Sequence, residues 1–377
     1  MKRIIKIGMD VHSTTYTLCA AEPRLGEPDY QLGSIRVTAD PRNIVDFIEH
    51  IKKKLGDRED TDVVCGYEAG CLGYSLYHAL QAKHIPCVIL APSTMLSPQG
   101  KRVKTDTRDA EMICQCLCHG GYQQVHVPTM EDEEVKEYIR MREDHKEALK
   151  KVKQQIQSFC LRHGYPYTEA TKWTAKHLKW LNNLELDGLL KDILTEYMIT
   201  YRNMVDRIEQ FDAKIEELGH SERYREKVKK LGCFLGIKTH SALAILTETG
   251  DFTRFAKGNI YGSYLGLAPG EQSSGTHIVR TGVSKAGNSH LRKILVEAAQ
   301  SICKGVVGYK CKALKARQKG NTSEVIAYAD KANLRLRKKY YRLVHQGKRR
   351  NVAVTAVARE LACFIWGMMT DHIDNAA

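Results

Sequence analysis

Residues 101–110 read Lys-Arg-Val-Lys-Thr-Asp-Thr-Arg-Asp-Ala, and this stretch decides how the first third of the chain is interpreted. Thr105 is a typical helix N-cap, and the pair of glycines at 120–121 is a typical stop. We therefore expect a helix of about four turns between them. Asp106 and Asp109 are three residues apart and share one face of this helix.

The face that carries the two aspartates continues through the apolar residues Ile113 and Cys116, so the carboxylates lie at the top of a face that packs inward. Carboxylates are rarely buried unless they are paired or bind metal. A helix dipole alone also favours acids at an N-terminus. Basic residues around the start of the helix favour an acidic site that faces a polyanion. Those expected to contact nucleic acid are Lys101, Arg102, Lys104 and Arg108.

Charge is the most informative feature of the composition. The chain has 377 residues, enough for two or three domains, and a formal net charge of +14. Such a field favours nucleic acid or an anionic membrane as partner. We find no apolar run near the roughly 18 residues of a membrane span, and the N-terminus is too short and too charged for a signal sequence. We expect a cytoplasmic protein that faces nucleic acid and not a membrane.

The twelve cysteines are scattered, apart from the group Cys114, Cys116 and Cys118, and do not resemble a secreted disulfide framework. This group, followed by His119, could suggest zinc. A helix points positions i and i+2 in different directions, and no second Cys/His pair follows. Buried thiols are therefore the preferred interpretation.

Before the opening helix, hydrophobic runs and turn residues predict an α/β domain. The expected elements are strands at 4–11, 15–20 and 31–37, a helix at 41–55, a strand at 62–68, a helix at 72–83 and a strand at 86–91. The first three strands should form an antiparallel meander. This element order is that of the ribonuclease-H-like fold, which carries acids on the first strand, at the end of the fourth and on the last helix. The residues at those places are Asp10, Glu68, Asp106 and Asp109.

The middle of the chain, about 132–218, is expected to form two long helices. Apolar residues of the second helix follow a strict 3–4 spacing that is typical of a coiled-coil seam. They are Leu194, Tyr197, Tyr201, Met204, Ile208, Phe211, Ile215 and Leu218. An intramolecular helical hairpin is the alternative. We favour oligomerisation, because both helices are long for an insert of a monomer.

Further along, residues 231–242 are expected to form a helix-hairpin-helix-like element in a mainly α C-terminal domain, and the hairpin amides would contact phosphate. Glycine-flanked loops follow, one with Ser273 and Ser274 and one that opens a helix; such loops suit a backbone that approaches phosphate closely. An ordinary turn is the alternative. The basic residues and the amide expected to bind nucleic acid in this region are Lys285, Asn288, Arg292, Lys293, Lys348, Arg349 and Arg350.

Six pieces of sequence now point to one family. They are Gly-Met-Asp-Val-His at 8–12, Tyr-Glu-Ala at 67–69, Lys-Thr-Asp-Thr-Arg-Asp-Ala at 104–110, Leu-Gly-Ile at 235–237, Ser-Ser-Gly at 273–275 and Lys-Ala-Gly-Asn-Ser-His-Leu-Arg at 285–292. The chain resembles the DEDD transposases of bacterial insertion sequences, described as bridge-RNA-guided recombinases.

The resemblance implies three parts: a RuvC-like (Holliday-junction-resolvase-like) domain at 1–128, a coiled coil at 129–220 and a transposase domain with a nucleophilic serine at 221–377. It implies a tetramer of two dimers, with sites shared between protomers. A structured non-coding guide RNA would select the donor and target double-stranded DNA.

For the chemistry, the resemblance implies that Asp10, Glu68, Asp106 and Asp109 are catalytic, and four carboxylates can hold two Mg²⁺ ions about 4 Å apart. The family pattern favours Ser274 over Ser273 as the nucleophile, which forms a covalent phosphoserine. Lys285 and Arg292 would hold phosphates. Two alternatives remain open: a metal-dependent nuclease that resolves junctions by hydrolysis, and a non-catalytic nucleic-acid-binding protein.

Overall fold

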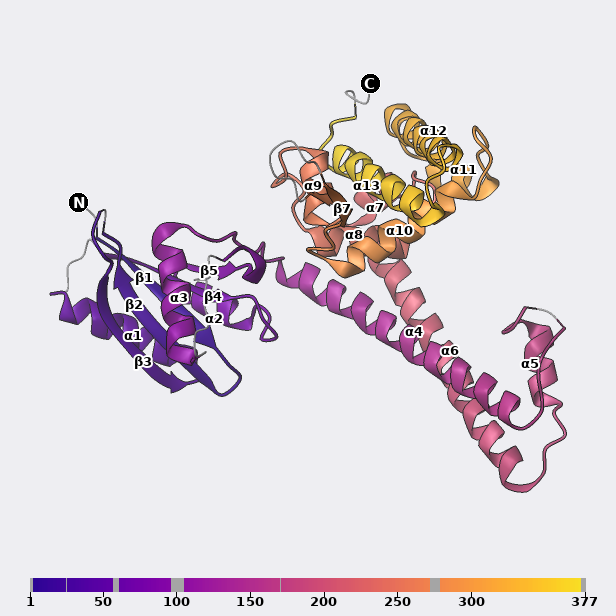
Figure 1. Cartoon of the computed structure of the whole chain (residues 1–377), viewed down its shortest axis with the longest axis horizontal. Coiled ribbons are helices and arrows are strands. Elements are labelled where there is room, and N and C mark those ends of the chain that lie inside the picture. Colours follow the sequence, from indigo (N-terminus) through magenta and orange to yellow (C-terminus); the bar gives the residue numbers. More distant parts are fainter. Residues whose placement is uncertain are drawn as a thin grey trace. The chain divides into compact units, whose positions relative to one another are not determined.

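The chain forms two compact units, Met1–Val127 and Pro128–Ala377, in a computed structural model that describes residues 3–24, 26–56, 61–95, 105–169, 171–271 and 279–373. Figure 1 labels their helices and strands. The division into three parts at 128 and 220 stays a prediction. We describe each unit by itself.

The first unit is built on a five-stranded mixed sheet. Its strands are β1 (Arg3–Val11), β2 (Thr15–Glu22), β3 (Tyr30–Thr38), β4 (Thr61–Glu68) and β5 (Cys87–Leu90), in the order β3-β2-β1-β4-β5. The first three strands pair antiparallel, as the meander predicts, whereas β4 runs parallel to both β1 and β5. The α/β class and the order of these elements are therefore confirmed.

Helices cover both faces of this sheet. Residues of α1 (Pro41–Lys54) and α2 (Ser75–Gln81) share one core with Ile5, Ile7 and Met9. The opening helix, α3 (Asp106–His119), packs on the other face through Ala110 and Cys114. A short 3₁₀ helix, Pro92–Thr94, follows β5. Because strand side chains alternate, β2 contributes to both cores: Leu18 and Ala20 to the first, Cys19 and Ala21 to the second.

Gly8 determines how closely α3 approaches the sheet. A Cβ atom at this position would lie 2.3 Å from the Ala110 carbonyl oxygen and 2.2 Å from the Cys114 nitrogen. The helix backbone therefore lies directly on β1, which only glycine permits. The thiol of Cys114 donates a 3.3 Å hydrogen bond to the Lys6 carbonyl, and Cys116 is also buried, whereas Cys118 is only partly buried. The interpretation of buried thiols is therefore confirmed for two of the three cysteines.

The second unit begins with a long helical hairpin. Its arms are α4 (Met130–Arg162) and α6 (Gly188–Gly219), and α5 (Ala175–Asn182) lies in the connection between them (Figure 1). The apolar seam of α6 is filled from within the chain: Leu194, Tyr201 and Ile208 share a core with residues 149–160 of α4. Helix α4 therefore covers much of this seam within the chain, as the alternative of an intramolecular hairpin predicts, and assembly of copies through these helices stays a prediction.

The rest of the second unit is a helical bundle with one short hairpin. Its elements are α7 (Arg225–Leu231), α8 (Thr239–Thr249), α9 (Gly258–Tyr264), β6 (Pro269–Glu271), β7 (Arg280–Val283), α10 (Ser289–Cys303), α11 (Lys312–Gln318), α12 (Ser323–His345) and α13 (Arg350–Met369). The turn between α7 and α8 packs on α10, since a Cβ at Gly236 would lie 2.6 Å from the Ala298 carbonyl oxygen. That this turn binds phosphate stays a prediction.

Helix α13 lies at the centre of this bundle and contacts α9, α10 and α12. Among the described residues, α13 is the one helix long and apolar enough to cross a membrane, which corrects the expectation that no apolar run comes near that length. Within the bundle, 56% of its most apolar window is buried, including Val357, Leu361 and Ile365. Core helices of water-soluble proteins meet the same criterion of length and composition, so the finding is weak support for a membrane span.

Candidate active site

Two of the predicted acids lie at the same edge of the sheet. β1 and β4 run parallel, with Met9 paired to Tyr67, so Asp10 and Glu68 follow that pair side by side at the ends of their strands. A cavity of about 220 Å³ opens here, lined by residues 9–12 and 67–72. The register of the sheet therefore places both carboxyl groups at one concave surface.

Helix α3 brings a third acid to this edge. Thr105 caps the helix, and its hydroxyl accepts a hydrogen bond from the Arg108 amide. Ala110 of the helix lies against Gly8 of the strand. Asp106 lies four residues before Ala110, which is about 6 Å along the helix. Asp10 lies two residues after Gly8, which is about the same distance along the strand. The close contact at Gly8 thus sets the meeting of Asp10 and Asp106.

Asp10, His12 and Asp106 form a cluster in which potential ligand atoms lie within 4.8 Å of one another. The Nε2 atom of His12 is 3.2 Å from Asp10 Oδ2 and 3.9 Å from Asp106 Oδ1. Arg36 Nη2 lies 3.3 Å from Asp106 Oδ2. The cluster combines two carboxylates and one imidazole, which is a donor set for a divalent metal ion.

Register also explains how Arg36 reaches the site. Asp10 pairs with Thr17 on β2, and Thr17 pairs with Arg36 on β3, so the three form one row across the sheet. Cys19 faces α3, and Thr17 shares that face because it is two residues away. Arg36 therefore extends from the sheet toward the start of α3, where Asp106 lies.

Burial makes the negative charge of Asp10 unfavourable unless a cation lies close to it. Burial raises the pKa of its carboxyl group above the ordinary value, His12 partly offsets this, and the negative charges of Asp109 and Asp106 raise the pKa further. Among the described residues, Asp10 Oδ2 is buried without a hydrogen bond; His12 lies at ion-pair distance only. A buried, unbonded carboxylate oxygen among further acids fits a metal ligand.

The structure thus brings together some of the predicted acids more closely than others. Asp10 and Asp106 join the ligand cluster, Glu68 lines the adjacent cavity, and Asp109 acts on Asp10 through its charge. His12 and Arg36 were not predicted. The spacing Asp-Val-His at the end of a strand could have indicated His12, whereas no local pattern indicates Arg36.

Several predicted residues lie outside the described part of the chain. These are Lys101, Arg102, Lys104, Ser273 and Ser274. Arg108 is described and is exposed on the first turn of α3. At the start of α13, Arg349 is the N-cap and Arg350 the first helical residue, and both are exposed together with Lys348.

The loop before α10 is held by close backbone contacts. A Cβ at Gly266 would lie 2.0 Å from the Ala286 carbonyl oxygen, and one at Gly287 would lie 2.0 Å from the Tyr264 carbonyl oxygen. Lys285 is exposed and has a positive φ of 55°. These contacts fix the segments on both sides of the β6–β7 hairpin. In the sequence, Ser273 and Ser274 lie between β6 and β7.

The predicted nucleic-acid contacts on α10 also have partners within the protein. Asn288 caps α10 and donates a 2.6 Å hydrogen bond to Glu248. Arg140 of α4 donates two further hydrogen bonds to the same carboxylate. Arg292 donates to three backbone carbonyls, and Lys293 lies 3.8 Å from Glu147. Asn288 and Arg292 therefore stabilise the loop, and their contact with nucleic acid stays a prediction.

Comparison with known proteins agrees with this geometry. The family model DEDD_Tnp_IS110, described as a transposase, matches residues 7–166, and the model of the transposase IS116/IS110/IS902 family matches residues 228–310. The chain is similar to a putative transposase, y4qE, of Sinorhizobium fredii, with 32% identity over 96% of this chain and 87% of the relative.

A second relative is the transposase for insertion sequence element IS1533 of Leptospira borgpetersenii, which is 31% identical over 93% of this chain and 99% of its own length. The transposase for insertion sequence element IS1111A of Coxiella burnetii is 23% identical over 61% of this chain and 63% of its own length. The DEDD-type family suggests a divalent metal and implies a DNA substrate. This chain is accordingly a DNA transposase and belongs to the IS116/IS110/IS902 family of insertion-sequence transposases.

Proposed function

We propose that this transposase is an RNA-guided, site-specific recombinase that exchanges DNA strands through a covalent phosphoserine. The observation that carries the cleavage step of this proposal is the unbonded, buried oxygen of Asp10 beside His12 and Asp106. Such a site is costly to keep unless it binds a cation, because buried carboxylates repel one another and lose hydration. It therefore supports cleavage of a phosphodiester at this edge of the sheet.

The first unit is, in this proposal, a ribonuclease-H-like (RuvC-like) nuclease domain. The mixed sheet, with a three-stranded meander continued by two parallel strands, supports it. So does the placement of Asp10 and Glu68 at one edge and of Asp106 and Asp109 on the helix that covers it. A shared fold alone does not establish an activity, so the acids carry the argument.

Asp10, Glu68, Asp106 and Asp109 would hold two Mg²⁺ ions. Bound there, the ions would stabilise charge on the attacking and leaving oxygens of the phosphodiester. His12 offers a further nitrogen ligand at the exposed side of the cluster, since 53% of its side chain is accessible. Arg36 holds Asp106 from the opposite side, so this acid is oriented before DNA arrives.

The covalent step belongs to Ser274. Its Oγ atom attacks the phosphorus and releases the hydroxyl proton to water, and the bridging oxygen of the strand leaves with the electron pair and takes up a proton. The phosphoserine keeps the bond energy, so a hydroxyl of the exchanged strand can later displace Ser274 without another energy source. The anchored glycines at 266 and 287 support this role, because they hold the flanking backbone firmly.

Nucleic acid would be held by the predicted basic residues at the start of α3, around α10 and at the start of α13. Donor and target DNA would be selected by a structured non-coding RNA. Because the serine and the acids belong to different compact units, we propose that a tetramer of two dimers assembles each site from two protomers. A serine hydroxyl is a weak nucleophile alone, so the reaction would wait for assembly.

Two serine variants and one acid variant test the proposal. The protein is purified with the non-coding transcript that flanks its gene and is mixed with short donor and target duplexes in Mg²⁺. Ser274→Ala should bind both nucleic acids but form neither a covalent adduct nor recombinants, Ser273→Ala should be milder, and Asp10→Asn should not cut. Digestion of trapped adduct should leave a nucleotide mass on the peptide that contains Ser274.

Each alternative gives a different result. Cleavage without an adduct would replace this mechanism by metal-dependent hydrolysis. Normal cutting by Asp10→Asn would exclude the role of the acid cluster. Recombination by protein free of RNA would refute guidance by RNA while leaving the chemistry in place.

A further inference from the structure

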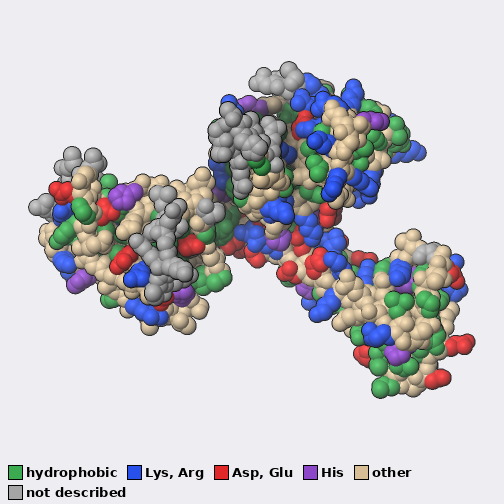
Figure 2. All heavy atoms as spheres, in the orientation of Figure 1, with side chains coloured by type: hydrophobic (Ala, Val, Ile, Leu, Met, Phe, Trp, Pro, Cys, Tyr) green, Lys and Arg blue, Asp and Glu red, His purple; other side chains and the backbone are tan. Residues whose placement is uncertain are grey.

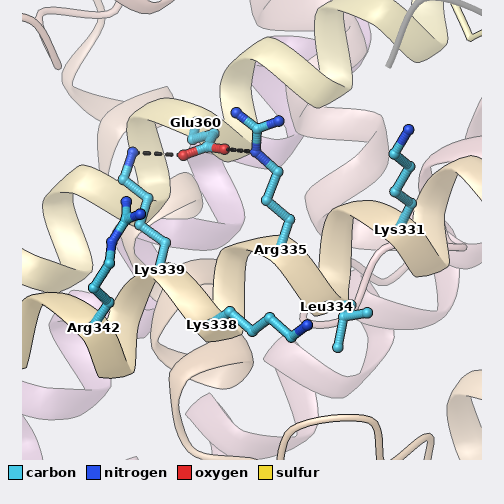
Figure 3. A pocket seen from close by; sticks show the side chains of 7 residues that line it. All are labelled: Lys331, Leu334, Arg335, Lys338, Lys339, Arg342 and Glu360. Carbon is cyan, nitrogen blue, oxygen red and sulfur yellow. Dashed lines mark hydrogen bonds and ion pairs between the residues drawn. The ribbon is translucent and has the colours of Figure 1, made fainter. Parts of the chain in front are cut away.

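A basic groove runs along α12 in the second unit, away from the acids and the serine loop in sequence. It encloses about 620 Å³, and its lining consists of Lys331, Leu334, Arg335, Lys338, Lys339, Arg342 and Glu360 (Figure 3). Figure 2 shows Lys and Arg side chains gathered on the surface that α12 and α13 form. Five cations against one carboxylate leave the groove strongly positive.

The spacing of these cations makes a stripe on one side of the helix. Lys331, Arg335, Lys338 and Arg342 are separated by four, three and four residues, which places them on one face of α12. At 1.5 Å per residue the stripe is about 16 Å long. An extended row of charges of this length suits a polymeric anion better than a single small one.

Glu360 of α13 organises the base of the groove. Its side chain is 15% exposed and accepts 2.5 Å hydrogen bonds from Arg335 Nε and Lys339 Nζ. Burial alone would raise the pKa of this carboxyl group, but its bonds with Lys339 and Arg335 lower it below the usual range. The carboxylate therefore stays charged and holds two of the cations in place.

The other cations of the groove have no such partner. In the described part of the chain, the side chains of Lys331, Lys338 and Arg342 make neither an ion pair nor a hydrogen bond. Arg337 of the same helix is different: it is 4% exposed and donates to the backbone carbonyls of residues 302, 306 and 309. Helix α12 thus uses one arginine for its own packing and presents the others outward.

Repulsion between unpaired like charges lowers the stability of the fold unless an anion neutralises it. The lining offers a row of lysine and arginine charges, the groups that neutralise phosphates, and contacts to phosphates carry no sequence information. We propose that this groove binds the phosphate backbone of a DNA duplex without regard to sequence. The assignment rests on the DNA substrate of the family, and it is independent of the proposed serine and guide RNA.

A duplex of DNA is favoured over a duplex of RNA because DNA is the substrate that the family implies. The stripe lies on a continuous helix of 23 residues. Double-stranded DNA carries one phosphate charge for about every 1.7 Å of its axis, so a stripe about 16 Å long can meet several phosphates.

The test is the salt dependence of binding by the full-length protein. The variant is Lys338→Glu with Arg342→Glu, and the probe is a 30-base-pair DNA duplex of arbitrary sequence, with an RNA duplex of the same sequence as the second arm. The matched control is Lys191→Glu with Lys227→Glu, two exposed lysines of α6 and α7 that change the net charge equally.

Each phosphate contact contributes about 0.9 to the slope of log K against log salt concentration, so the loss of two contacts should lower the slope by about 2 and weaken binding about 60-fold at 100 mM salt. The control should change the slope much less. An equal slope for variant and control would overturn the proposal, and so would a loss confined to the RNA arm. If the reversed charges unfold the protein, Lys338→Gln with Arg342→Gln should show the same direction at about the same reduction in slope.

Discussion

The contact between Gly8 and α3 offers a direct test of how this fold builds its acid site. In Gly8→Ala, the new methyl group would lie 2.2 Å from the Cys114 nitrogen and 2.7 Å from its Cα, whereas an ordinary contact needs about 3.4 Å. Both obstacles are helix backbone and cannot rotate away. We therefore expect α3 to move outward by about 1 Å, which carries Asp106 away from Asp10.

The size of the effect follows from that displacement. Overpacking of a core costs about 1–3 kcal/mol of unfolding free energy, which in a domain of this size lowers the melting temperature by roughly 3–15 °C. A displacement of about 1 Å at a catalytic site can reduce the rate about 100-fold. We expect cleavage to be reduced even at temperatures where the variant is fully folded, because the fold can adjust around the methyl group while the metal geometry cannot.

Gly33→Ala is the matched control for this substitution. Gly33 lies on β3 of the same sheet, and its new methyl group would meet Ile51 Cδ1 at 3.7 Å, an ordinary contact. Both variants are compared by thermal melting and by Mg²⁺-dependent DNA cleavage at a temperature where both are folded. Equal melting temperatures and equal cleavage rates for the two variants would refute the reasoning.

Two further predictions concern the second unit. Phe211→Asp should lower the free energy of unfolding by about 3–5 kcal/mol, because Phe211 packs edge-on against Tyr138 and His145 of α4. The difference from wild type, measured by urea unfolding, should not depend on protein concentration. A marked dependence would point to packing between chains. Asp132→Asn should lower the free energy of unfolding by about 1–3 kcal/mol at pH 7, since Asp132 accepts hydrogen bonds from Arg223 and Tyr224. Burial opposes ionisation of Asp132, but these bonds lower its pKa below the ordinary 3.8, so its stabilisation is present above that pH and is lost as the pH falls through the folded value. The difference between Asp132→Asn and wild type should therefore shrink in urea unfolding at pH 3, and an unchanged difference would contradict this origin.

Local signals in the sequence were sufficient for most elements of the first unit. The strands, the order of elements and the span of α3 follow from hydrophobic runs, turn residues and the Thr105 cap, all of which act over a few residues. Asp10 and Asp106 could be selected as partners only because a known fold supplied the topology. Nothing local in the sequence brings β1 next to α3.

The row Asp10, Thr17 and Arg36 shows what a linear pattern does not contain. Each residue lies on a different strand, and a shift of one residue in either pairing would turn Arg36 to the other face. Register depends on the packing of both sheet faces at once. Arg36 therefore became part of the site only in the folded sheet.

In the second unit the sequence determined that α6 needs a partner but not which one. A 3–4 seam records one apolar face, and α4 of the same chain satisfies it as well as a second copy would. The same holds for Asn288 and Arg292, whose polarity predicts contact with phosphate, although Glu248 and three carbonyls meet part of that need within the fold. The type of an amino acid determines whether its side chain needs an apolar contact, a hydrogen bond or an opposite charge. Which group provides that contact depends on packing between residues that are far apart in the chain.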